Sequence, residues 1–144
     1  VDEFLPGESA DGMSGGPVWH LANPPTASVS WFDSVADKER ERNLMVKFHR
    51  QRGHVYGIQP QAKGRSRDYA VFAKSNFQPG EKEVYISVMV PHATKKAPGE
   101  VSKGITTTLS EAGDVSVQIQ PPGKEKANAV NAEIAADGEW SVKR

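Results

Sequence analysis

The sequence has no cysteine among its 144 residues. The chain therefore contains no disulfide, no thiol nucleophile and no thiolate ligand for a metal, although this does not fix its compartment. It also lacks an excess of either charge, with 18 acidic and 18 basic side chains. No overall field draws it to nucleic acid or to an anionic membrane. No apolar run reaches the length of a membrane-spanning helix, and no signal peptide is visible. We therefore expect neither nucleic acid nor a membrane as a partner.

What the sequence does contain is alternation of apolar and polar residues with a period of two, the pattern of β-strands. In residues 43–49 it predicts that Leu44, Val46 and Phe48 share one face. In residues 83–90 it predicts that Ile86 and the valines point inward, whereas Tyr85 points outward. The predicted strands are residues 1–5, 17–21, 28–32, 43–49, 54–59, 69–74, 83–90, 104–109, 115–119, 129–135 and 140–142.

Turn-forming residues punctuate these strands at near-regular spacing, for example at residues 78–81, 97–99, 120–123 and 137–138. This pattern predicts an all-β fold, an antiparallel β-sandwich. Only the charged residues 34–42 could form one or two helical turns. With no repeat and no low-complexity linker, residues 1–144 are predicted to be a single domain. Because the chain opens on Val1 and on strand-like residues, we expect it to be a piece of a longer protein.

Residues 12–17 (GMSGGP) resemble the loop around the nucleophile of trypsin-like serine proteases. A serine becomes nucleophilic only when a neighbouring base takes its proton. No histidine precedes Ser14, so a base would have to come from downstream in another chain order. The favoured interpretation is a glycine-rich turn before a strand; the alternative is a truncated serine hydrolase with Ser14 as nucleophile.

Among the four histidines, only His49 and His54 lie close enough in sequence to suggest a metal site. A hairpin turn between them would bring both together, but neighbouring lysine and arginine side chains would repel a divalent ion. We expect solvent-facing histidines there and no metal. The tryptophans could stack against sugars; Trp140 is predicted to be a core residue, whereas Trp19 and Trp31 are left open.

Basic residues concentrate around two predicted strand connections although the whole chain is neutral. Arginine binds carboxylate or sulfate through paired hydrogen bonds, and tyrosine offers a stacking face and a hydroxyl. An anionic polymer is therefore the expected partner, the alternative being loops that are merely solvated. His54 and Tyr56 share a predicted face with Ile58 and can act together only if that face is open to solvent. The predicted substrate-binding residues are His54, Tyr56, Arg50, Arg52, Arg65 and Arg67.

Several short segments, in their order along the chain, resemble the β-sheet region of heparinase II/III-like polysaccharide lyases. The family has a D-x-F strand, then a W-H or L-H strand, and later a P-G-E … V-L-x-P-H strand. The matching segments are residues 1–4 (VDEF), 16–21 (GPVWHL), 31–33 (WFD), 43–48 (NLMVKF), 79–92 (PGEKEVYISVMVPH) and 137–144 (DGEWSVKR).

The resemblance implies an enzyme with an N-terminal α-helical toroid and a C-terminal β-sandwich, of which this chain would be the sandwich. Such lyases cleave uronic-acid polysaccharides by β-elimination, in which a base removes the proton at C5. The family's catalytic tyrosine lies in the helical part and its key histidines lie early in the sheet region. No residue here matches them, so no catalytic residue and no cofactor is assigned.

The resulting prediction is the β-sandwich portion of a lyase acting on an acidic polysaccharide, periplasmic or secreted, with scaffold and substrate contacts but no activity of its own. Its predicted partners are that polysaccharide and the N-terminal helical domain of the same enzyme. The alternative is a stand-alone carbohydrate-binding module, which would use the same residues without chemistry.

Overall fold

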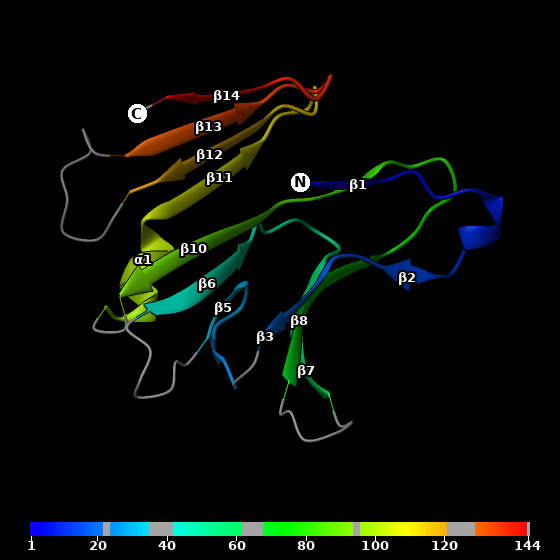
Figure 1. Ribbon diagram of the computed structural model, residues 1–144. Helices are drawn as coiled ribbons and strands as arrows, with labels where there is room; N and C mark the ends of the chain where they lie inside the picture. Colours follow the sequence, from blue (N-terminus) through cyan, green and yellow to red (C-terminus); the bar gives the residue numbers. More distant parts are fainter. Residues whose placement is uncertain (22–23, 35–41, 62–67, 94–95, 121–128, 144) are drawn as a thin grey trace. The chain divides into compact units, whose positions relative to one another are not determined.

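The computed structural model describes residues 1–21, 24–34, 42–61, 68–93, 96–120 and 129–143. The chain forms two compact units, Val1–Thr94 and Lys95–Arg144, and each is described by itself. Most of the segment 34–42, which by its sequence could form one or two helical turns, lies outside the described residues. Figure 1 shows that nearly all the described elements are strands, and every strand pairing is antiparallel.

The first unit contains two main sheets and a small two-stranded one. One sheet has the order β10-β6-β5-β4, and β1 pairs with β9. In the other, β8 is central, with β7 along one edge and β3 followed by β2 along the opposite edge. The strands are β1 Asp2–Phe4, β2 Ser14–Gly15, β3 Val18–Leu21, β4 Thr26–Ala27, β5 Trp31–Asp33, β6 Arg42–Phe48, β7 Val55–Gln61, β8 Asp68–Asn76, β9 Glu83–Tyr85 and β10 Ser87–Ala93, with a 3-10 turn at Glu8–Ala10.

The core of this unit is filled by side chains from both sheets. Val46 and Phe48 of β6 meet Val71 and Ala73 of β8, and all four are at most 1% exposed. The cluster is completed by Leu21, Phe32 and Tyr85, with Trp19, Leu44, Tyr56 and Ile58 packed against it. Fully burying a valine, leucine or phenylalanine side chain contributes about 1.5–3 kcal/mol to folding. The predicted all-β antiparallel sandwich is therefore confirmed, as is the shared face of Leu44, Val46 and Phe48.

The predicted outward orientation of Tyr85 is wrong, because this side chain is 1% exposed in the core. The expected strand 83–90 is two strands, β9 and β10, with Ile86 between them. β9 pairs with β1, whereas β10 pairs with β6. Because the chain changes sheets at Ile86, the alternation does not continue through it, and both Tyr85 and Ile86 are buried.

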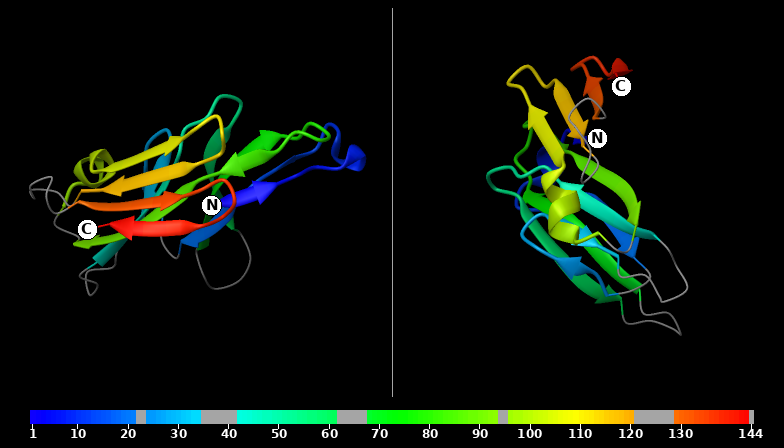
Figure 2. Two further views of the ribbon diagram at one scale, coloured as in Figure 1. Left: turned by 90° about the horizontal axis from the view of Figure 1, so that it is seen from above. Right: turned by 90° about the vertical axis from the view of Figure 1, so that its left-hand side faces the viewer.

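The second unit is a short helix followed by a four-stranded antiparallel meander, whose strands lie side by side in chain order (Figure 2). Alternate residues give it an apolar face, on which Ile105 and Val115 are buried, and a polar face. Its elements are α1 Pro98–Lys103, β11 Ile105–Leu109, β12 Val115–Ile119, β13 Val130–Ile134 and β14 Trp140–Lys143. The predicted core position of Trp140 is wrong: it lies on the edge strand β14 and is 74% exposed.

Candidate functional site

The six residues predicted to bind substrate divide into three groups. Arg50 and Arg52 are exposed in the connection between β6 and β7. Arg65 and Arg67 lie outside the described residues. Tyr56 is on the face of β7 that turns toward the core, since Tyr56 and Ile58 pack against the core cluster, and His54 directly precedes β7. A joint role of His54 and Tyr56 in ligand binding stays a prediction.

The hydroxyl of Tyr56 closes the turn between β6 and β7. It donates a hydrogen bond to the carbonyl oxygen of His49 at 2.7 Å and accepts one from the backbone N–H of Gln51 at 2.9 Å. The ring lies 5.7 Å from that of Phe48, centroid to centroid. Burial raises the pKa of the Tyr56 hydroxyl, against the smaller lowering effects of the Gln51 hydrogen bond and the Arg50 charge. Its observed role is structural, and contact with a ligand stays a prediction.

The imidazole of His54 is also engaged within the protein. Its Nε2 lies 3.1 Å from a carboxylate oxygen of Glu83, and its ring stacks on Tyr85 with the centroids 4.6 Å apart. The side chain is 5% exposed. The amide of Gln51 also donates a hydrogen bond to the carbonyl of Val84 at 2.6 Å. These contacts fasten the β6–β7 connection to β9.

A second histidine–carboxylate pair is buried in the first unit. Nε2 of His92 lies 2.6 Å from Oδ1 of Asp33, whose other oxygen accepts a hydrogen bond from the Asn43 amide at 3.0 Å. Nδ1 of His92 faces the carbonyl of Ala93 at 3.0 Å. Nδ1 can form a hydrogen bond with the Ala93 carbonyl only by donating a proton to it. The contact between Nε2 and the Asp33 carboxyl needs a second proton, carried by the imidazole or by the carboxyl. With His92 7% and Asp33 1% exposed, the pair offers almost no surface to a ligand.

Ser14 lies exposed in β2, where its backbone pairs with Asn76 of β8. No hydrogen bond joins the Ser14 hydroxyl to a histidine within the described parts of the chain. His54 and His92 are each held by a carboxylate elsewhere in the unit. Ser14 thus belongs to the short strand before the connection from β2 to β3, and within the described residues no histidine is hydrogen-bonded to its hydroxyl as an activating base would be. Within the described residues, no three histidine, aspartate or glutamate side chains form a group that could hold a metal ion.

An open hollow lies on the sheet that is formed by β2, β3, β7 and β8. Residues 71, 73 and 75 of β8 face the core side, so Ala70, Phe72 and Lys74 face the other side. They are joined there by Val18 and His20 of β3, which pair with Phe72 and Ala70. The hollow has a volume of about 500 Å³; we call it the β8 groove, lined by Gly15, Gly16, Val18, His20, Gln59, Ala70, Phe72, Ala73 and Lys74.

Glycines shape the β8 groove. Gly57 of β7 pairs with Phe72, and a Cβ at Gly57 would lie 2.7 Å from the Phe72 ring, so the ring covers the glycine. The Lys74 ammonium lies 5.9 Å from the centroid of that ring, within cation–π range. The groove thus combines an aromatic ring, a lysine, an imidazole and the amide of Gln59. None of the four described residues of the predicted set lines it.

The alternation of apolar and polar residues, and not the distribution of charge, indicates part of this groove. Residues 17–21 and 69–74 are both predicted strands, and alternation places Phe72 and Lys74 on one face. The sequence does not indicate that β3 and β7 flank β8. This pairing brings His20 and Gln59 beside Phe72 and Lys74.

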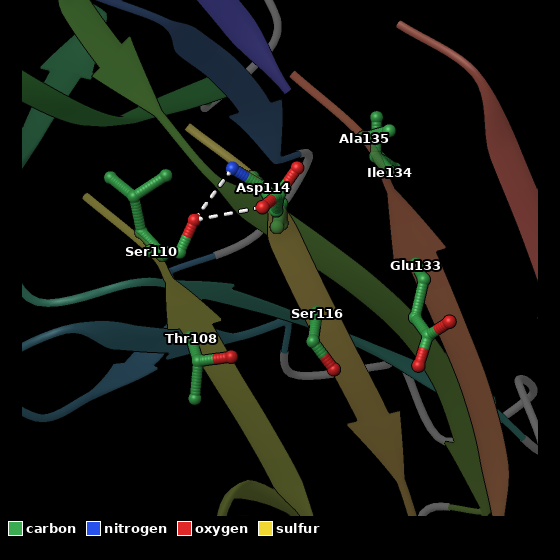
Figure 3. A pocket seen from close by; sticks show the side chains of 9 residues that line it. Thr108, Ser110, Asp114, Ser116, Glu133, Ile134 and Ala135 are labelled. Carbon is green, nitrogen blue, oxygen red and sulfur yellow. Dashed lines mark hydrogen bonds between the residues drawn. The ribbon is translucent and has the colours of Figure 1, made fainter. Parts of the chain in front are cut away.

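A second hollow, of about 440 Å³, lies in the second unit between β11, β12 and β13. Thr108, Ser116 and Glu133 form a row across these strands (Figure 3). Asp114 links the β11–β12 turn to the β13–β14 turn: its Oδ2 accepts a hydrogen bond from the Ser110 hydroxyl at 3.1 Å, and its Oδ1 accepts one from the backbone N–H of Ala136 at 3.1 Å. With two carboxylates and no cation in its lining, this hollow does not suit an anionic ligand.

Within the described residues, no helix is long and apolar enough to cross a membrane. Comparison of the chain with protein-family models, with curated proteins and with solved structures finds no match.

Proposed function

We propose that this chain is the substrate-contacting β-sandwich part of a polysaccharide lyase that acts on an acidic, uronic-acid-containing polysaccharide. In this proposal the chain binds and positions the polymer, and the residues that carry out β-elimination lie elsewhere in the enzyme. The resemblance of six short segments to heparinase II/III-like lyases supports the enzyme class. The β8 groove supports the binding role, and this is the observation on which the proposal rests.

The chemistry of the groove fits an anionic sugar. The half-buried ring of Phe72 offers an apolar surface for the C–H face of a pyranose. Lys74, which is exposed beside it, can bind a carboxylate through a charge-assisted hydrogen bond. His20 and Gln59 can exchange hydrogen bonds with hydroxyl groups. A few polar groups around an apolar surface in an open hollow are typical of small-ligand sites.

The chain offers little for the chemical step itself. A general base must reach the proton that it removes, yet the side chains of His54 and His92 are buried, at 5% and 6% exposed. Tyr56 and Tyr85 direct their hydroxyl protons to backbone carbonyls. We therefore assign these residues to the scaffold.

A stand-alone carbohydrate-binding module is the second candidate, because the same groove would serve it without any chemistry. The lyase is expected to carry a helical toroid domain upstream of the sandwich, whereas a stand-alone module is not. The full reading frame therefore distinguishes the two candidates, and a helical toroid domain upstream favours the lyase. The truncated serine hydrolase is not favoured, given the surroundings of Ser14.

The proposal is tested by titrating the chain with heparin, alginate and a neutral glucan in isothermal titration calorimetry at low salt. We expect weak binding of the acidic polymers only. Lys74→Gln should reduce the affinity about threefold to tenfold, the effect of losing one partly exposed charged contact.

Lys82→Gln is the matched control, because Lys82 is an exposed lysine outside the groove whose ammonium pairs with Glu3 at 2.8 Å. It should leave the affinity within twofold of the original. Equal losses in both variants would mean that binding is not located in the groove. Formation of unsaturated uronate, seen as new ultraviolet absorbance with this chain alone, would contradict the absence of the catalytic residues.

A further inference from the structure

The outer edge of β14 carries backbone groups that have no partner strand within the described residues. β14 pairs only with β13 there. The backbone N–H of Ala135 donates to the carbonyl of Glu139 at 2.7 Å, which makes these two opposed residues a hydrogen-bonded pair. Hydrogen-bonded and non-hydrogen-bonded pairs alternate along an antiparallel ladder. Ser141 and Lys143 therefore direct their backbone groups toward β13, and Trp140 and Val142 direct theirs to the open edge.

The side chains on this edge are unusually apolar for their exposure. Trp140 is 74% and Val142 is 50% exposed, and both lie on the apolar face of the sheet. Edge strands that must stay single are commonly protected by proline or by unmatched charges. β14 contains no proline. The charge of its lysine, Lys143, is matched by that of an acidic residue nearby in the chain, Glu139, so β14 lacks both of these protections.

We propose that β14 pairs with β14 of a second copy of this chain, antiparallel and centred on Ser141, so that two four-stranded meanders form one continuous sheet. Such a two-fold contact must be self-complementary. In this register Trp140 lies opposite Val142 of the second copy, and each of these two pairs can exchange both backbone hydrogen bonds.

The charges match in the same register. Glu139 lies opposite Lys143 of the second copy, at a position where side chains approach closely because the pair is not hydrogen-bonded. Within one copy, Lys143 contacts Glu133 at 3.4 Å, a pair in which both side chains are more than half exposed. That contact is weak and leaves Lys143 available to the second carboxylate. Moving the centre by one residue to Trp140 would set Val142 opposite Gly138, in the turn before β14, so fewer strand residues would pair.

The contact is short, so the dimer is expected to be weak and dependent on concentration. Sedimentation velocity of the full chain from about 1 µM to about 1 mM, the range in which weak complexes dissociate, should show a shift from monomer to dimer. Val142→Pro removes an N–H that points to the open edge and leaves the ladder to β13 in place. It should weaken dimerisation about tenfold or more, because symmetry removes two hydrogen bonds.

The charge pair gives a second test that does not depend on proline. Lys143→Glu should weaken the dimer, and Glu139→Lys combined with Lys143→Glu should restore it. Glu133→Gln is the control, since it removes only the partner within one copy, and it should leave dimerisation unchanged. Circular dichroism confirms that each variant is folded. A chain that stays monomeric throughout, a dimer that withstands both Val142→Pro and Lys143→Glu, or a double variant that fails to restore dimerisation would each overturn the proposal.

Discussion

The hydroxyl of Tyr85 joins three strands of the first unit. It donates to the carbonyl of Gly15 in β2 at 2.7 Å, and it accepts from the backbone N–H of Ser75 in β8 at 3.0 Å. Because the single hydroxyl proton goes to Gly15, the Ser75 hydroxyl at 2.7 Å must donate its own proton to Tyr85. The ring meanwhile stacks on His54 and fills the core.

Tyr85→Phe should destabilise the protein by roughly 1–3 kcal/mol, because it leaves the half-buried Gly15 carbonyl and the buried Ser75 N–H without their partner. The free energy of unfolding from urea denaturation measures the loss. Tyr69→Phe removes the same atom from a half-buried tyrosine of β8 and should change stability by less than about 0.5 kcal/mol. Similar losses in the two variants would show that the Tyr85 network contributes nothing specific.

The connection from β2 to β3 depends on a glycine at the edge of the β8 groove. Gly16 has a φ of 154°, and a Cβ there would lie 2.1 Å from the carbonyl oxygen of Ala73 and 3.0 Å from the Tyr85 ring. The backbone therefore approaches β8 too closely for any side chain. This close approach lets β2 and β3 run successively along one edge of β8, as the first unit of Figure 1 shows.

Gly16→Ala should cost at least about 2 kcal/mol, since it combines backbone strain with a contact that β8 must move to relieve. It should also weaken polysaccharide binding, because the groove is built on this connection. Gly7→Ala is the matched control: Gly7 has a φ of −78°, and a Cβ added there would have no neighbour within 4 Å. That variant should be neutral or slightly stabilising. Thermal and urea unfolding measure the stability of both variants, and equal stabilities of Gly16→Ala and Gly7→Ala would contradict the prediction.

At the scale of the whole molecule, the balance of charge decides how a polyanion can be attracted. With 18 acidic and 18 basic side chains the chain has no net charge, so attraction has to come from a local group such as Lys74. Exposed charges are screened over about 10 Å at 0.1 M salt. A single-lysine site in a neutral protein therefore gives a short-ranged and modest attraction.

The affinity for an acidic polysaccharide should fall with rising salt with a shallow slope, corresponding to about one to two released counterions. Calorimetric titrations at several salt concentrations measure this slope. The slope should become shallower in Lys74→Gln and stay unchanged in Lys82→Gln. A steep slope that Lys74→Gln does not alter would locate binding at a larger basic surface, such as the predicted arginines.

The fold class follows from the sequence alone, because alternation and turn residues are local properties that antiparallel strands require. The sequence also locates most strands within a few residues, as β6, β11 and β12 illustrate. The prediction that the chain is a single domain stays a prediction, as does the role of the arginines. The residues of the β8 groove were not predicted, because charge and aromatic character point to another region, in which the fold uses His54 and Tyr56 for its own polar contacts.

Which face of each strand meets the core, and which strands are neighbours, depends on the three-dimensional fold. Tyr85 is buried because the chain changes sheets at Ile86, and Trp140 is exposed because β14 lies at a sheet edge. His20, Phe72 and Lys74 line one groove because β3 pairs with β8. These pairings join residues some fifty positions apart in the sequence. A local pattern fixes the period of a strand but carries no information about its partner or about which of its faces will be covered.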